Sequence, residues 1–215
     1  MAAQDVSEGD GWSQTGLPAS YVIEAARRGD AQEIVRLVAA GAPLGQALWF
    51  ATRQTTSISM DSLKFLLEVC GSAGVNSCSS TGWTPLASAV LNCENRWRRP
   101  DLRIIELLLS KGANPNQRIV TAHFIDTPLQ LMHRPNYSAL TRRLVSHLLL
   151  RYGAEISPAT TDPYLCKVAA AGGLRAYEKA HRRALATTLT RVVFPRLPVD
   201  VVSHVVAFSF HTGYY

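Results

Sequence analysis

Hydrophobic residues recur along the chain in short stripes that are separated by glycine-containing turns. Ile34, Leu37 and Val38 are spaced as i, i+3 and i+4, which places their side chains on one face of a helix. Gly41 follows this stripe, at the position where a helix often ends in a left-handed residue. A shorter apolar segment and a turn precede the stripe. The segment 21–42 therefore predicts two short helices joined by a turn.

The same pattern returns twice downstream with two recurring markers. Thr84–Leu86 and Thr127–Leu129 both read Thr-Pro-Leu, and their starts lie 43 residues apart, at 84 and 127. Gly-Ala pairs close the two units at 112 and 153, which is 41 residues apart. Threonine caps the first free N–H groups of a helix, and proline at the first helical position loses no backbone hydrogen bond. Two independent markers with nearly the same period predict an internal repeat.

The Thr-Pro-Leu start, the leucine-rich second helix and the Gly-Ala-x-x-Asn end resemble the ankyrin repeat, a unit of 33 residues with a β-turn and two helices. The resemblance covers about residues 17–180 and implies four to five repeats. The second repeat is degenerate, and a fifth over 164–179 is expected to cap the array. The third and fourth repeats are longer than 33 residues, and we place their extra residues between the helices, at 92–100 and 134–138.

Such repeats hide their apolar faces only against their neighbours, so an array is stable where a single unit is not. The expected fold is therefore all-α, an ankyrin-repeat helical solenoid with a short C-terminal helical appendage. We expect a disordered tail over 1–16, the repeat domain over 17–180 and the appendage over 181–215.

The appendage carries a second motif. A Leu-Pro pair is followed two residues later by an aspartate and then by paired aliphatic residues one helical turn apart. This resembles the opening helix of an F-box, as found in the PRANC region at the C-terminus of poxviral ankyrin proteins. The resemblance implies docking onto the Skp1 subunit of a cullin ubiquitin ligase, through Leu197, Pro198, Asp200, Val201, Val202, Val205, Val206 and Phe208.

Two other interpretations of the appendage remain open. It also resembles a SOCS box, which implies binding to elongin B/C, but Leu189 stands where that box prefers cysteine. Alternatively, the terminal helix only caps the solenoid by covering the apolar face of the last repeat.

Candidate target-binding residues are the aromatic and arginine side chains near the presumed inner helices and insertions. Ankyrin proteins commonly present partner-contacting side chains from their inner helices, and tryptophan and arginine are enriched at binding hot spots. The candidates are Trp49, Trp83, Arg96, Trp97, Arg98 and Arg99.

Composition and charge exclude several other classes of protein. Of the 215 residues, 47% are hydrophobic and 18% are charged, which is typical of a folded domain. The formal net charge is +6, but the arginine pairs are scattered and form no single stripe, so we expect no nucleic-acid partner. Residues 1–16 do not resemble a signal peptide, and no apolar run is long enough to span a membrane. We expect an intracellular monomer that does not associate with membranes. Its expected location is the cytoplasm, with the nucleus as an alternative.

The sequence contains no motif that indicates catalysis, a metal or a cofactor. The six histidines form no His-Glu-x-x-His spacing, and the four cysteines form no Cys-x-x-Cys pair. Gly-x-Ser-x-Gly, P-loop and Gly-x-Gly-x-x-Gly patterns are also missing. Cys93 and Cys166 are expected to be buried structural thiols.

The sequence therefore predicts a non-enzymatic protein–protein interaction module with no catalytic, metal or cofactor site. In the first hypothesis it is a substrate-recognition adapter of a cullin-RING ubiquitin ligase, in which the repeats hold the target and the C-terminal helix holds Skp1 or elongin. In the second hypothesis it is an ankyrin scaffold or inhibitor that has no link to a ligase.

Overall fold

The computed structural model describes most of the chain, which forms two compact units. The units are Met1–Glu155 and Ile156–Tyr215. Within residues 208–211, and at Ala73, only the backbone is described. The described ranges are 19–53, 58–79, 81–93, 102–121, 123–134, 137–193 and 196–211, so the tail expected over 1–16 lies outside them.

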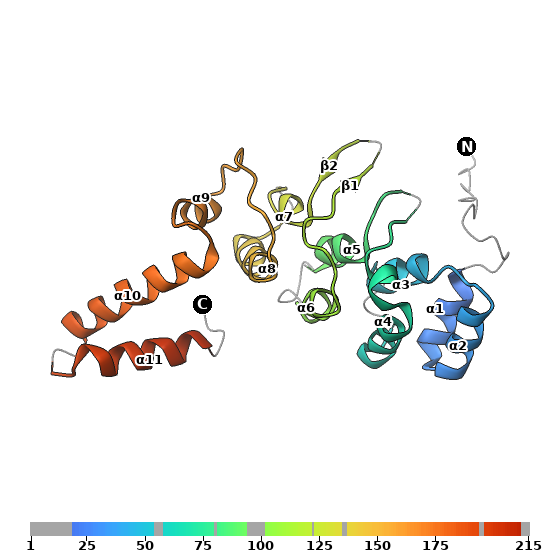
Figure 1. The fold of residues 1–215 in the computed structure, drawn as a ribbon, viewed down its shortest axis with the longest axis horizontal. Helices are drawn as coiled ribbons and strands as arrows, with labels where there is room; N and C mark the ends of the chain where they lie inside the picture. The colour runs from blue at the N-terminus through green and yellow to red at the C-terminus, as the bar shows by residue number, and fades with distance from the viewer. Residues whose placement is uncertain are drawn as a thin grey trace, which may run out of the picture. The chain divides into compact units, whose positions relative to one another are not determined.

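The first unit is a series of helix pairs (Figure 1). The first helix of each pair contacts the first helix of the next pair, and the second helices of the first three pairs also contact in turn. This arrangement confirms the predicted all-α helical repeat fold. The pairs are α1 (Ala19–Arg28) with α2 (Ala31–Ala39), α3 (Leu44–Arg53) with α4 (Met60–Val75), α5 (Pro85–Asn92) with α6 (Arg103–Ser110), and α7 (Pro128–Leu131) with α8 (Ala139–Arg151).

The Thr-Pro markers begin helices as the sequence predicts. Thr84 caps α5, where its Oγ1 accepts a hydrogen bond from the Ala87 amide at 3.1 Å. Thr127 caps α7 in a reciprocal arrangement with Gln130: the threonine Oγ1 accepts from the Gln130 amide at 3.3 Å, and Gln130 Oε1 accepts from the Thr127 amide at 2.8 Å. Both caps satisfy N–H groups that a helix start otherwise leaves free.

Asparagine side chains connect successive repeats through equivalent hydrogen bonds. Asn76 Oδ1 accepts from the Asn114 amide at 2.7 Å, and its Nδ2 donates to the Gly112 carbonyl at 2.9 Å. Asn116 repeats this pattern one unit later, with the Glu155 amide at 2.8 Å and the Gly153 carbonyl at 2.9 Å. The recurrence shows that the second, third and fourth repeats stack in a common register.

The core of the first unit consists of the apolar residues that recur in each helix pair. Each pair contributes at least one fully buried aliphatic side chain, so burial is continuous along the array. Examples are Ile34 in α2, Leu48 in α3, Leu66 in α4, Leu86 in α5, Ile105 in α6, Leu129 in α7 and Leu149 in α8.

Two long connections lie where the sequence places the extra residues, between α5 and α6 and between α7 and α8. The sequence did not specify the short antiparallel hairpin between α6 and α7. This hairpin is formed by β1 (Ile119–Val120) and β2 (Ile125–Asp126), in which Ile119 pairs with Asp126 and Val120 with Ile125.

The second unit contains α9 (Pro163–Ala170), α10 (Leu174–Val192) and α11 (Val199–His211). Asp162 caps α9 by accepting from the amides of Tyr164 and Leu165. The helix α10 continues well past residue 179, where the fifth repeat was expected to end, so the predicted boundary at 180 falls inside this helix.

The helix α11 folds back along α10 and forms a helical hairpin with it (Figure 1). Val202 and Val206 are buried against Ala186, and Leu185 and Leu189 pack around them. Within the described residues, no helix is both long and apolar enough to cross a membrane.

Candidate protein-binding surfaces

The first candidate surface is built on the β1–β2 hairpin and the turn before α5. Successive residues of a strand face opposite sides, so Ile119 points into the core and is fully buried. Val120 and Ile125 occupy directly opposed positions, and they are 57% and 51% exposed. Two aliphatic side chains therefore lie next to each other on the outer face of this hairpin.

An aromatic and cationic cluster supports the same hairpin. The Phe124 ring centroid lies 5.8 Å from that of Trp83 in an edge-to-face arrangement. The Arg134 guanidinium carbon lies 3.8 Å from the Phe124 ring centroid, and its Nη2 is 2.9 Å from Asp126 Oδ2. The ring and the carboxylate together fix the arginine, so the cluster is organised before any partner binds.

We call Trp83, Val120, Phe124, Ile125 and Arg134 the finger surface. Trp83 is the one member that the sequence identified as a target-binding candidate. Phe124 was missed because its contact with Trp83 joins separate repeats. Arg134 was missed because it packs on Phe124, and only its position in a predicted insertion hinted at a surface role.

Trp49 lies in a separate aromatic cluster on α3. Its ring centroid is 4.7 Å from that of Phe50, and the Arg53 guanidinium carbon is 5.4 Å from it. Both aromatic side chains are half-buried, so Trp49 remains a candidate contact residue. The structure places Trp49 and Trp83 in different clusters.

Arg96, Trp97, Arg98 and Arg99 lie outside the described residues. Their role in binding a target stays a prediction from sequence.

The C-terminal hairpin divides the predicted ligase-binding residues into two sets. Val202 and Val206 are 1% and 4% exposed because they pack against α10. Val201 and Val205 are 43% and 53% exposed on a different face of the same helix. Leu197, Pro198 and Asp200 are exposed as well, and the side chain of Phe208 is not described.

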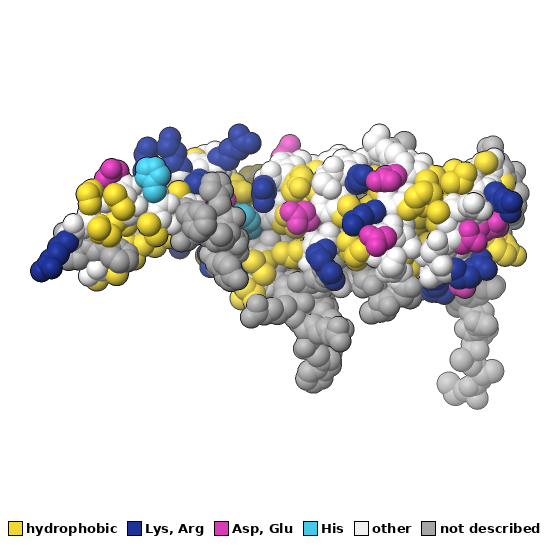
Figure 2. All heavy atoms as spheres, turned by 90° about the horizontal axis from the view of Figure 1, so that it is seen from below, with side chains coloured by type: hydrophobic (Ala, Val, Ile, Leu, Met, Phe, Trp, Pro, Cys, Tyr) yellow, Lys and Arg dark blue, Asp and Glu magenta, His cyan; other side chains and the backbone are white. Residues whose placement is uncertain are grey.

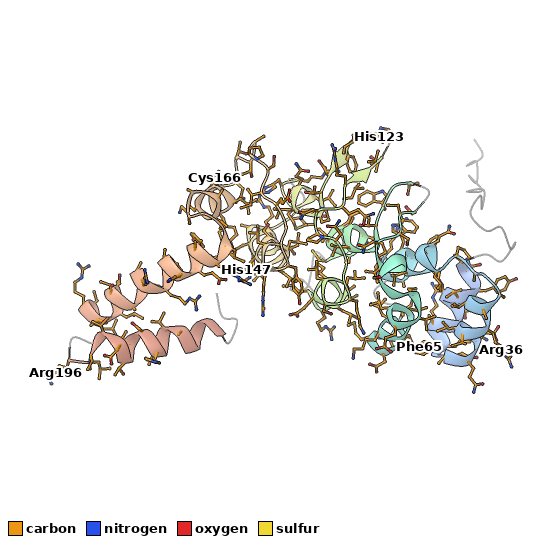
Figure 3. All side chains as sticks on the ribbon, in the orientation of Figure 1. Arg36, Phe65, His123, His147, Cys166 and Arg196 are labelled. Carbon is orange, nitrogen blue, oxygen red and sulfur yellow. The ribbon has the colours of Figure 1, made fainter. Side chains whose placement is uncertain are left out.

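The sequence did not predict the hollow between α2 and α4. It has a volume of about 400 Å³, is open to solvent and is lined by Ala31, Gln32, Val35, Arg36 and Phe65. Figure 3 labels Arg36 and Phe65, which come from the two helices. The hydrophobic stripe of α2 predicted the helix, but it gave no signal that Val35 would remain exposed beside Phe65.

The cysteine and histidine side chains form no cluster that suits a metal ion within the described part of the chain. Cys93 is buried as expected, whereas Cys166 is exposed, contrary to expectation. Cys166 lies on the outward side of α9, and its Sγ is 3.4 Å from the Thr160 carbonyl. Burial raises the pKa of the Cys70 thiol from 9.0 to about 11, so it stays protonated and unreactive at neutral pH.

Comparisons with known proteins agree with the repeat pattern. The family model described as ankyrin repeat matches residues 81–119, a segment that includes α5, α6 and the start of β1. This match indicates a protein–protein interaction module. A search of curated proteins gave no match to the chain.

Proposed function

We propose that the chain is a substrate-recognition adapter of a cullin-RING ubiquitin ligase. In this proposal the helix pairs of the first unit bind a target protein, and the α10–α11 hairpin binds the ligase subunit Skp1. Elongin B/C is the second candidate for that subunit. Neither role requires a metal, a cofactor or catalysis.

One observation about α11 carries the proposal. A helix that only caps α10 needs one apolar face, and Val202 with Val206 provides it. Val201 and Val205 add a second aliphatic face that stays exposed to solvent. Exposed aliphatic pairs on a helix that already has its own packing face are typical of a docking surface.

The geometry changes the role of the two buried valines. We assign Val201, Val205 and Leu197 to contact with the ligase subunit, because their side chains are accessible. We assign Val202 and Val206 to folding of the hairpin instead of to ligase contact. Pro198, Asp200 and Phe208 stay candidate contact residues.

The finger surface is a stronger candidate for the target-binding surface than the Trp49 cluster on α3. It combines a tryptophan, a fixed arginine and two exposed aliphatic side chains, which are residue types that suit a protein interface. Trp49 provides a second possible contact on α3.

The first experiment measures binding of purified full-length protein to Skp1 and, separately, to elongin B/C. We expect the double substitution Val201→Asp with Val205→Asp to abolish binding, because it places two carboxylates in an apolar contact. Circular dichroism is expected to show unchanged helix content, since both positions are exposed.

The matched control is Val120→Asp with Ile125→Asp, which makes the same chemical change at similarly exposed positions of the first unit. These substitutions are expected to leave Skp1 binding intact and to weaken target binding. The ligase proposal is wrong if the wild-type protein binds neither subunit, or if the α11 variant binds as well as wild type.

The second candidate function is a scaffold or inhibitor with no link to a ligase. Burial of Val202 and Val206 against α10 favours it, because this packing alone gives α11 a structural role. This function predicts that affinity purification recovers a target protein without any ligase subunit.

A further inference from the structure

The distal part of the C-terminal hairpin has an uneven charge distribution. Residues 179–199 contain no aspartate or glutamate. The same segment contains five basic residues. One of them, Arg182, has its Nη2 3.9 Å from Glu178 Oε2. The five are Lys179, Arg182, Arg183, Arg191 and Arg196.

Three of the exposed aliphatic side chains of the same hairpin lie on one of its sides, while Val193 and Val199 are exposed elsewhere on it. On α10, Val192 follows the packing residue Leu189 by three positions, and it is 66% exposed. On α11, Val201 and Val205 each precede a buried valine by one position. In an antiparallel helix pair, these offsets rotate all three side chains toward the same side of the helix–helix contact.

We call Val192, Val201 and Val205 the valine strip. Figure 2 shows hydrophobic side chains gathered over this end of the chain, with a basic group at its extremity. Figure 3 labels that extremity as Arg196, which lies in the turn between α10 and α11.

We infer that the partner of the hairpin presents an apolar groove with a rim of carboxylates. The valine strip fills the groove, and the basic residues of 179–199 face the acidic rim. This inference rests on the proposed ligase function and names the chemistry of the surface that receives the hairpin.

The charge of the hairpin decides which kind of partner the valine strip contacts. A second copy of the chain would bring the same excess of arginine and lysine to the contact, and like charges across an interface are unfavourable. An anionic lipid surface would meet the turn at the hairpin end, whereas the strip continues along α11 to Val205. A protein groove with acidic edges fits both the strip and the charge.

The two kinds of contact have different kinetic consequences. Charges around a contact mainly raise the association rate constant and make it depend on salt. The buried aliphatic contacts mainly set the dissociation rate constant. Substitutions in the two sets of residues are therefore expected to affect different rate constants.

The test measures association and dissociation of the full chain with Skp1 and with elongin B/C, at low and high salt. For Arg191→Glu with Arg196→Glu, we expect the association rate constant at low salt to fall about tenfold and the dissociation rate constant to stay unchanged. At high salt the wild type and this variant are expected to associate at similar rates, because screening removes the attraction.

The matched control is Arg28→Glu with Arg36→Glu, which changes the net charge equally but in the first unit, and it is expected to associate like wild type. A binding reaction that is independent of salt and unaffected by the Arg191 and Arg196 substitutions would overturn the inference and leave the ligase function standing. Failure of the wild type to bind either subunit would overturn both.

Vesicles of phosphatidylcholine with phosphatidylserine distinguish the lipid alternative. The inference expects no binding to these vesicles. Vesicle binding that is lost in the Arg191 and Arg196 variant, without binding to either ligase subunit, would replace the acidic groove with an anionic membrane surface.

Discussion

At the residue scale, glycines with the same backbone conformation have different neighbours. Gly82 and Gly112 both have a positive φ, of 81° and 90°. A Cβ at Gly82 would collide with the carbonyl oxygen of Val120 in β1, whereas a Cβ at Gly112 would meet no atom within 4 Å. Gly82 therefore permits the turn before α5 to lie directly against the β1–β2 hairpin.

We predict that Gly82→Ala is more destabilising than Gly112→Ala. The left-handed conformation alone costs about 1–2 kcal/mol for alanine, and this cost applies to both variants. Gly82→Ala has the additional cost of separating the turn from β1. Urea unfolding of both variants measures the difference, and hydrogen exchange at the Thr121 amide, which donates to the Phe124 carbonyl at 3.0 Å, reports whether the hairpin moves. Equal losses of stability would contradict the role given to Gly82.

Residue-level signals in the sequence predicted local features, such as helix caps, better than they predicted tertiary contacts. Thr84 and Thr127 cap helices because the cap depends only on the next three residues. The Val-Val pairs of α11 gave no such information, because either valine of a pair can face the core. Which one does so depends on how α11 is rotated against α10, and that rotation is fixed by tertiary packing.

At the element scale, the asparagine side chains act as connectors between helix pairs. Asn76 spans from the end of α4 to the loop after α6, and Asn116 spans from that loop to the end of α8. Each side chain satisfies one amide and one carbonyl of the neighbouring repeat. Stacking of the repeats therefore includes directional hydrogen bonds in addition to apolar burial.

Asn76→Ala is expected to lower the free energy of unfolding by about 1–3 kcal/mol, because it removes hydrogen bonds to the Asn114 amide and the Gly112 carbonyl. Asn116→Ala is expected to have a similar effect one repeat later. Asn92→Ala serves as the comparison, since the hydrogen bond that Asn92 Nδ2 makes among the described residues stays within its own helix, to the Ser88 carbonyl at 2.8 Å. If all three variants lose the same stability in denaturant titrations, the bonds between repeats have no special role.

The sequence predicted the order and pairing of the helices but not their irregular parts. The apolar stripes and Thr-Pro starts are periodic, so α5 and α6 were predictable. The β1–β2 hairpin was not predictable, because each strand has only two residues. Its position depends on burial of Ile119 and on the contacts of Phe124, which are tertiary. The predicted domain boundary at 180 came from the length of the expected fifth repeat, but no proline or glycine ends the helical pattern there, so α10 continues to Val192.

At the scale of the whole molecule, stability is expected to be distributed along the chain by local contacts. Repeat proteins are stabilised by each unit and by its nearest neighbours, so a change at one end has a limited reach. The division into Met1–Glu155 and Ile156–Tyr215 follows the same principle. The α10–α11 hairpin has a small core of its own, so it is suited to change without disturbing the first unit.

Hydrogen exchange of Val206→Ala tests this independence. The substitution removes a buried side chain from the hairpin core and is expected to cost about 2 kcal/mol locally. Amides of α10 and α11 are then expected to exchange faster, while those of α3 and α5 stay as protected as in wild type. Val205→Ala removes the same atoms from an exposed position and is expected to change neither region. Faster exchange in α3 and α5 of the Val206 variant would mean that the chain unfolds as one cooperative body, and the hairpin could then not bind a partner independently of the repeats.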